Sequence, residues 1–173
     1  METSLRYGES KALRESKGLR IHAKQKFPPN SPTHLLVRGE LDTRLGGPTF
    51  ASAMIRHTHL HLMATLGLGV KYDKYDKFWY CIRGKKGFPV TNDDDLVTFN
   101  LKGLCDADKD FKHKKLKGAA ELSWTIPDFQ KHQDVRFKVG YELVHQVPYF
   151  QVRENNWTLN ADVNGRWNVR FDL

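Results

Sequence analysis

Residues 134–143 read DVRFKVGYEL, and apolar residues alternate there with polar residues or glycine. Val135, Phe137 and the odd-numbered residues after them are apolar, whereas Arg136, Lys138 and Glu142 are charged. Successive side chains of a β-strand point to opposite faces, so this segment predicts a strand with one apolar face and one charged face. Such a strand suits a soluble protein that buries the apolar face, or a membrane barrel that turns this face to lipid.

The same alternation recurs along most of the chain. It is present in residues 19–27, 34–43, 60–72, 78–85, 97–105, 115–126, 157–163 and 166–173. Turn signals such as GGP, DADKD and NG separate the runs, at intervals of roughly 10–16 residues. The crossover helices of a parallel sheet do not fit into such gaps. The sequence therefore predicts an all-β fold, an antiparallel meander of about twelve strands.

Length and charge narrow the alternatives. The chain has 173 residues, which predicts one domain over residues 1–173. A membrane strand needs about 9–11 residues, so a closed antiparallel transmembrane β-barrel of this length has about ten to twelve strands. No run of about 18 apolar residues predicts a transmembrane helix, and the N-terminus lacks the apolar region of a secretory signal. The net charge of +8 predicts anionic partners.

In a membrane barrel the charged faces have to point inward, because Lys or Arg on the lipid-facing side at the midplane costs about 2–4 kcal/mol. Aromatic residues near the ends of the runs, among them Trp79, Tyr80, Trp124 and Tyr149, fit girdles at the two membrane interfaces. A soluble barrel with its charged face outward alternates in the same way, so the pattern alone leaves both environments open. The cations on the polar faces, which we expect to line a pore and bind anions, are Arg20, Lys24, Lys26, Arg38, Arg83, Lys85, Lys102, Lys115, Lys117, Arg136, Lys138, Arg166 and Arg170.

Residues 9–20 consist of the tandem repeat ESKALR–ESKGLR. This segment fits either a helical or a flexible insertion near the N-terminus, ahead of the first regular strand.

Few other residues point to chemistry. His57, His59 and His61 share a parity at strand spacing, as zinc ligands can, but the sequence places no further ligand beside them. Cys81 and Cys105 form no CxxC motif and are expected to be free thiols. No nucleophile and base can be placed together. The sequence therefore predicts no enzyme, no metal site and no cofactor.

Several stretches are similar to the outer envelope pore protein 21 family of chloroplasts. They are METSLRYG (1–8), HLLVRGELDTRLGGPTF (34–50), LGLGVKYDK (66–74), RGKKGFPVT (83–91), KGAAELSW (117–124), FQKHQDVRFKVGYEL (129–143) and VPYFQVRENNWTLNADVNGRWNVRFDL (147–173). Their order and spacing cover nearly the whole chain, and the repeat at 9–20 is the main departure.

The resemblance implies an anion-selective β-barrel channel in the plastid outer envelope membrane. Channels of this family are expected to pass triose phosphates, phosphoglycerate, phosphate and other small anions, with ATP as a modulator. The partners implied are the lipid bilayer and these solutes, and a homo-oligomer is left open.

Two other functions compete with the channel. The first is a soluble basic β-barrel that carries a ligand. The second is a nucleic-acid-binding β domain, which needs its cations and aromatic residues on one exposed face. Here the two kinds of residue fall mostly on opposite parities, so no nucleic-acid partner is predicted.

Overall fold

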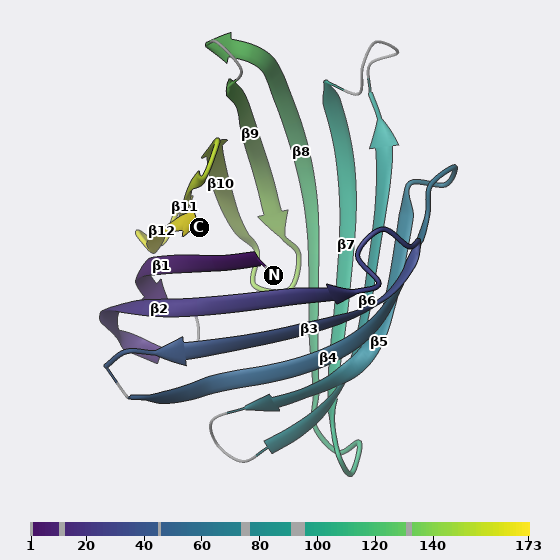
Figure 1. Ribbon diagram of the computed structural model, residues 1–173, viewed down its shortest axis with the longest axis vertical. Helices are drawn as coiled ribbons and strands as arrows, with labels where there is room; N and C mark the ends of the chain where they lie inside the picture. The colour runs from purple at the N-terminus through teal and green to yellow at the C-terminus, as the bar shows by residue number, and fades with distance from the viewer. Residues whose placement is uncertain (1, 11–12, 45, 74–76, 91–95, 131–132) are drawn as a thin grey trace.

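Twelve β-strands make up most of the chain in the computed structural model of the protein (Figure 1). The structure describes residues 2–10, 13–44, 46–73, 77–90, 96–130 and 133–173. Within these residues, no helix is long and apolar enough to cross a membrane. The strands are β1 (Glu2–Ser10), β2 (Leu13–Phe27), β3 (Thr33–Asp42), β4 (Gly47–His59), β5 (Ala64–Asp73), β6 (Lys77–Pro89), β7 (Val97–Asp108), β8 (Lys114–Gln130), β9 (Gln133–Glu142), β10 (Val147–Glu154), β11 (Trp157–Asp162) and β12 (Trp167–Asp172).

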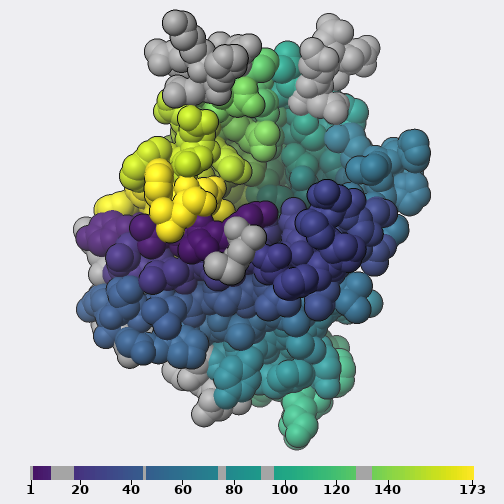
Figure 2. All heavy atoms as spheres, viewed as in Figure 1, coloured from purple at the N-terminus to yellow at the C-terminus, as the bar shows by residue number. Residues whose placement is uncertain are grey.

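The sheet closes on itself because the first strand pairs with the last. Ser4 lies opposite Asp172, and Gly8 lies opposite Asn168, in an antiparallel register between β1 and β12. In the space-filling view, the yellow C-terminal residues lie against the purple N-terminal ones (Figure 2). Every other pair joins consecutive strands, so no strand is left with an open edge. The predictions of an all-β fold, antiparallel pairing and about twelve strands in a closed barrel are confirmed.

The tandem repeat at residues 9–20 falls at the first hairpin. Residues 9 and 10 end β1, and residues 13–20 belong to β2. Residues 11 and 12 lie outside the described part of the chain. Where it is described, this segment is therefore extended strand.

The apolar side of the alternating runs faces outward. Leu66 and Leu68 of β5 are 68% and 63% exposed, and Val139 of β9 is 63% exposed. Among the strand residues whose side chains the structure describes, the charged ones on this outer side are Lys86, Lys114 and Glu154, each toward the end of its strand. An uncharged apolar band is what a barrel surrounded by lipid needs. A soluble carrier with its apolar faces packed inside does not fit this orientation.

One wall of the interior is apolar, which simple alternation did not predict. Leu36, Met54, Trp79 and Cys81 lie on the inward side of β3, β4 and β6 and are between 1% and 6% exposed. Met54, Trp79 and Cys81 form one buried cluster. We call these four residues the apolar wall. They fill the space beside β3–β6 with side chains instead of water.

Two aromatic residues assigned to the membrane girdles face the interior instead, so the prediction is wrong for them. Trp79 belongs to the apolar wall, and the Tyr149 hydroxyl donates a hydrogen bond to an inward carboxylate. Being near the end of a run does not decide which way a ring points, because neighbouring residues of a strand face opposite sides. Trp124 and Tyr80 do lie on the outer face, where they are exposed.

The exposed band predicts how a new charge acts on stability. Leu68→Lys places a cation near the middle of β5, where we expect a loss of about 2–4 kcal/mol in the free energy of unfolding from lipid vesicles. Phe88→Lys, near the end of β6, is the control and should cost about 0–1 kcal/mol because the headgroup region solvates the charge. Denaturant titration of both variants measures the difference. Equal costs at the two sites would contradict a lipid-facing band.

Candidate functional site: the interior of the barrel

The interior holds the cations that the polar parities predicted. Twelve of the thirteen lie on strands, in register with other inward residues; Arg6, for example, lies opposite Arg20, and Lys102 opposite Lys85. The thirteenth, Arg166, lies just before β12 and pairs with the Asp162 carboxylate at 3.0 Å. The twelve on strands are Arg20, Lys24, Lys26, Arg38, Arg83, Lys85, Lys102, Lys115, Lys117, Arg136, Lys138 and Arg170.

Sequence reasoning missed three inward arginines. Arg6 lies between the outward Leu5 and Tyr7, and period-two alternation was a sufficient signal to find it. Arg56 of β4 and Arg153 of β10 each have a polar neighbour in the sequence, which obscures the parity. In the structure both face the interior, opposite Gly67 and Arg136 respectively.

Five cations gather around one cavity of about 370 Å³. They come from β1, β9, β10 and β12, and no carboxylate is among the described residues that line the cavity. Carboxylates outside the lining balance part of this charge: Asp172 pairs with Arg153 at 3.4 Å and also with Arg170, Glu121 lies 3.7 Å from Lys138, and Glu40 lies 3.9 Å from Arg6. We call this group the cationic cluster: Arg6, Arg136, Lys138, Arg153 and Arg170. Guanidinium groups present several N–H donors in a plane and bind phosphate oxygens in pairs.

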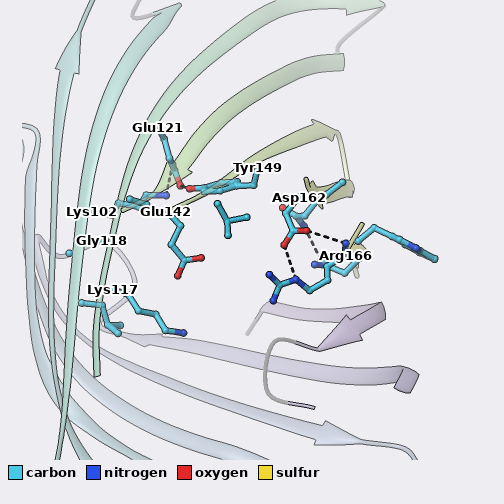
Figure 3. A pocket seen from close by; sticks show the side chains of 16 residues that line it. Lys102, Lys117, Gly118, Glu121, Glu142, Tyr149, Asp162 and Arg166 are labelled. Carbon is cyan, nitrogen blue, oxygen red and sulfur yellow. Dashed lines mark hydrogen bonds and ion pairs between the residues drawn. The ribbon is translucent and has the colours of Figure 1, made fainter. Parts of the chain in front are cut away.

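A second cavity of about 370 Å³ adjoins the cationic cluster, since Asn160 and Asn168 line both (Figure 3). Its charges are mixed. Lys117 and Glu142 point into it, and the Asp162–Arg166 ion pair lies on its far side (Figure 3).

Glu121 links four strands inside this second cavity. Its carboxylate, 5% exposed on β8, lies 2.6 Å from the Lys102 ammonium of β7 and 3.7 Å from the Lys138 ammonium of β9. The Tyr149 hydroxyl of β10 donates a hydrogen bond to it as a third polar contact. To reach β8, the Tyr149 ring crosses β9 at Gly140, where a Cβ atom would lie 2.4 Å from the ring. Gly140 therefore has no side chain because the ring occupies that space.

A third group of cations lies beside the apolar wall. The Nε atoms of Arg38, Arg56 and Arg83 are buried and have no hydrogen-bond partner among the described residues. Gly67 separates Arg56 from Arg83, and a Cβ atom there would come within 3.1 Å of the Arg56 side chain. We call these three residues the arginine triad. Their free donors are available to water or to an anion inside the barrel.

Charge is distributed unevenly along the barrel axis. Strands β3, β5, β7, β9 and β11 all run toward the same end, and each finishes there with an inward carboxylate. These acids are Asp42, Asp73, Asp106, Asp108, Glu142 and Asp162. We call this end the carboxylate end, and the opposite one, where β1 begins and β12 stops, the terminus end. Solutes therefore meet a different charge balance at the two mouths.

The three histidines lie at the end of β4 and in the turn after it. The Thr33 hydroxyl and the His57 Nδ1 are 2.7 Å apart, and the His59 and His61 ring centroids are 6.2 Å apart. Within the described ranges, no group of three or more His, Cys, Asp or Glu side chains is arranged to hold a metal ion.

Known proteins resemble the chain over its full length. Residues 3–173 match the family described as chloroplast outer envelope pore protein OEP21. Outer envelope pore protein 21 of Pisum sativum is 54% identical over 183 aligned residues, and outer envelope pore protein 21A of Arabidopsis thaliana is 52% identical over 173. The corresponding protein of Oryza sativa subsp. japonica is 43% identical over 185 residues. Each alignment covers the whole of both chains.

The Tyr149 contact predicts a stability difference between two tyrosines. Tyr149→Phe removes a hydrogen bond to a buried carboxylate, and we expect it to lower the free energy of unfolding by about 1.5–3 kcal/mol. Tyr141→Phe is the control, because Tyr141 is exposed on the outer face, and it should stay within about 0.5 kcal/mol. Unfolding titrations in detergent measure both. A Tyr149→Phe barrel as stable as the Tyr141→Phe barrel would show that the contact contributes nothing.

Proposed function

The chain belongs to the chloroplast outer envelope pore protein OEP21 family, and on that premise we propose that its barrel is an anion-selective channel for phosphorylated metabolites. Membership makes it a pore protein of the chloroplast outer envelope, and the family name points to a channel. The observation that carries the anion preference is the cationic cluster, five cations around a cavity with no carboxylate among its described lining residues.

The physics of the cationic cluster favours small anions. Cations around a narrow passage lower the energy of an entering anion and raise that of a cation, and low-dielectric walls strengthen the effect. Triose phosphates, phosphoglycerate and inorganic phosphate each present oxygens that Arg136 or Arg170 can bind in pairs. Passage requires several moderate sites, because one tight site traps its ligand. The cationic cluster and the arginine triad supply such sites in succession.

ATP suits the same interior as a modulator. A triphosphate carries several anionic groups on one chain, so it can contact two or three members of the cationic cluster at once. A solute with a single phosphate contacts fewer of them and is displaced. The nucleotide therefore competes with the smaller anions for the passage.

The outer face argues against the rival functions. A soluble carrier would hide its apolar residues, yet Leu66 and Leu68 stand outward. A nucleic-acid-binding domain would present cations together with exposed aromatic residues. Here the arginines lie inside, and the exposed rings such as Trp124 lie outside.

Charge reversal tests anion selectivity. Arg136→Glu and Lys138→Glu, studied separately in planar bilayers with asymmetric KCl, should each shift the reversal potential toward that of a cation-selective pore. Lys86→Glu is the matched control, because it makes the same charge change on the outer face. If Arg136→Glu and Lys138→Glu give the same reversal potential as Lys86→Glu, the proposal is overturned.

A milder substitution tests the nucleotide. Arg136→Gln removes one member of the cationic cluster, and we expect the ATP concentration that halves the anion current to rise about tenfold, equivalent to about 1.4 kcal/mol. Arg166→Gln is the control, since Arg166 lies outside the cluster and is paired with Asp162. Equal ATP sensitivity of the two variants would exclude the cationic cluster as the nucleotide site.

A further inference from the structure

We propose that the turn between β7 and β8, together with the outer face of β6, binds the headgroups of anionic lipids at the carboxylate end of the barrel. We call this surface the aromatic–lysine patch, and it consists of Phe78, Tyr80, Phe111, Lys112 and Lys114. The turn projects from the bottom of the barrel in Figure 1. The proposal requires that the barrel sit in a membrane, and it does not depend on which solutes pass through the barrel.

The first observation is the backbone of Phe111. Its φ angle is 56°, in the left-handed region that glycine adopts freely and a bulky side chain rarely does. The turn itself is ordinary, with the Phe111 N–H donating to the Asp108 carbonyl at 3.0 Å. Met63 and Gln146 adopt a similar φ in other turns, so the angle is a common turn feature here, and what distinguishes Phe111 is where its ring lies.

The ring of Phe111 stacks on Tyr80, with centroids 5.6 Å apart and planes within 5° of parallel. The Phe78 ring packs edge-on against the Tyr80 ring, with centroids 5.4 Å apart. Phe111 is nevertheless 60% exposed. Three aromatic rings therefore form a band on the outside of the rim, the place where membrane barrels carry their interfacial aromatic girdle.

The register shows that this surface faces lipid rather than the pore. Tyr80 lies opposite Ala107, which lies opposite Lys114, so all three are on the outer face in one row. The next residue, Lys115, turns inward and places its ammonium 4.3 Å from the ring centroid of Trp79. Because Phe111 stacks on the outward Tyr80, the turn leans over the outer side of the rim.

The charge of the turn matches an anionic surface. The segment 109–114 reads KDFKHK, with three lysines against one aspartate, and all six residues are exposed. Lysines next to a membrane surface attract anionic headgroups, and the attraction weakens with salt. The turn between β4 and β5, at the terminus end, has exposed Leu60 and Leu62 and no lysine. The turn between β4 and β5 therefore lacks the lysines of the aromatic–lysine patch.

The test compares the purified full-length barrel in vesicles of phosphatidylcholine with and without phosphatidylglycerol. We expect phosphatidylglycerol to raise the thermal unfolding midpoint of the unmodified protein, and high salt to cancel most of the rise. The double variant Lys112→Gln/Lys114→Gln should lose more than half of the rise in midpoint that phosphatidylglycerol causes. Lys86→Gln, at an outer-face lysine near the opposite end, should keep the rise and is the control for each single substitution, Lys112→Gln and Lys114→Gln, measured alone.

Phe111→Gly separates lipid binding from turn stability. Glycine suits the backbone at this position but loses the stack on Tyr80, so a purely structural turn would change stability by the same amount in both lipids. The proposal expects this variant to lose the phosphatidylglycerol effect. It is overturned if the lysine pair and Lys86→Gln respond alike to phosphatidylglycerol, or if Phe111→Gly retains the effect.

A third outcome would also overturn the proposal. If the lysine pair leaves the lipid response intact but lowers the phosphate current in planar bilayers, the turn attracts solutes to the mouth instead of binding lipid. The vesicle measurement involves no ion flow. A barrel that is not anion-selective can therefore still show the phosphatidylglycerol effect. The lipid-binding proposal and the anion-channel proposal can thus fail independently.

Discussion

A bilayer interior solvates neither charge nor unpaired backbone groups, and the rest of the structure depends on this constraint. The pairing of β1 with β12 satisfies the backbone by removing both edges of the sheet. The constraint on charge fixes which side chains of each strand face inward. A one-residue shift of register would turn every side chain of a strand to the other face and so expose the cations to lipid. Lys114 and Lys115 show how sharply it acts, since one lies on the outer rim and its neighbour lies inside over Trp79.

Turning the cations inward creates repulsion, and the interior relieves it unevenly. Glu121 balances Lys102 and Lys138 and is itself held by Tyr149. The arginine triad has no such partner among the described residues and lies against the apolar wall, where little water can screen it. Formal net charge is thus a poor guide to what a solute meets. Glu121 and Asp172 offset part of the charge of the cationic cluster, whereas the arginine triad keeps its charge.

The alternation along single strands was enough to predict the fold, because parity is a local property. The same local signal assigns twelve of the predicted cations to inward strand positions, but their role in binding anions stays a prediction. It could not resolve Leu35 and Leu36, two adjacent apolar residues of which only the second faces inward. Nor could it find the contact of Tyr149 with Glu121, which depends on the order β8–β9–β10 and on Gly140 between them. A contact that skips a strand exists only once the three strands are paired side by side.

Because only some interior cations are paired with carboxylates, the barrel can attract an anionic solute and still release it. If every cation were unpaired, a phosphorylated solute would bind tightly and block the passage. At the carboxylate end, acids of β3, β7 and β11 lie opposite or beside inward cations, as Asp42 does with Arg20 and Asp106 with Lys115, so charges there partly cancel. The cationic cluster and the arginine triad draw on different strands, so no single position has to hold the whole charge of a solute. If the barrel conducts anions as proposed, neutralising one cation removes only part of the selectivity, whereas it weakens a polyvalent ligand that contacts several cations at once.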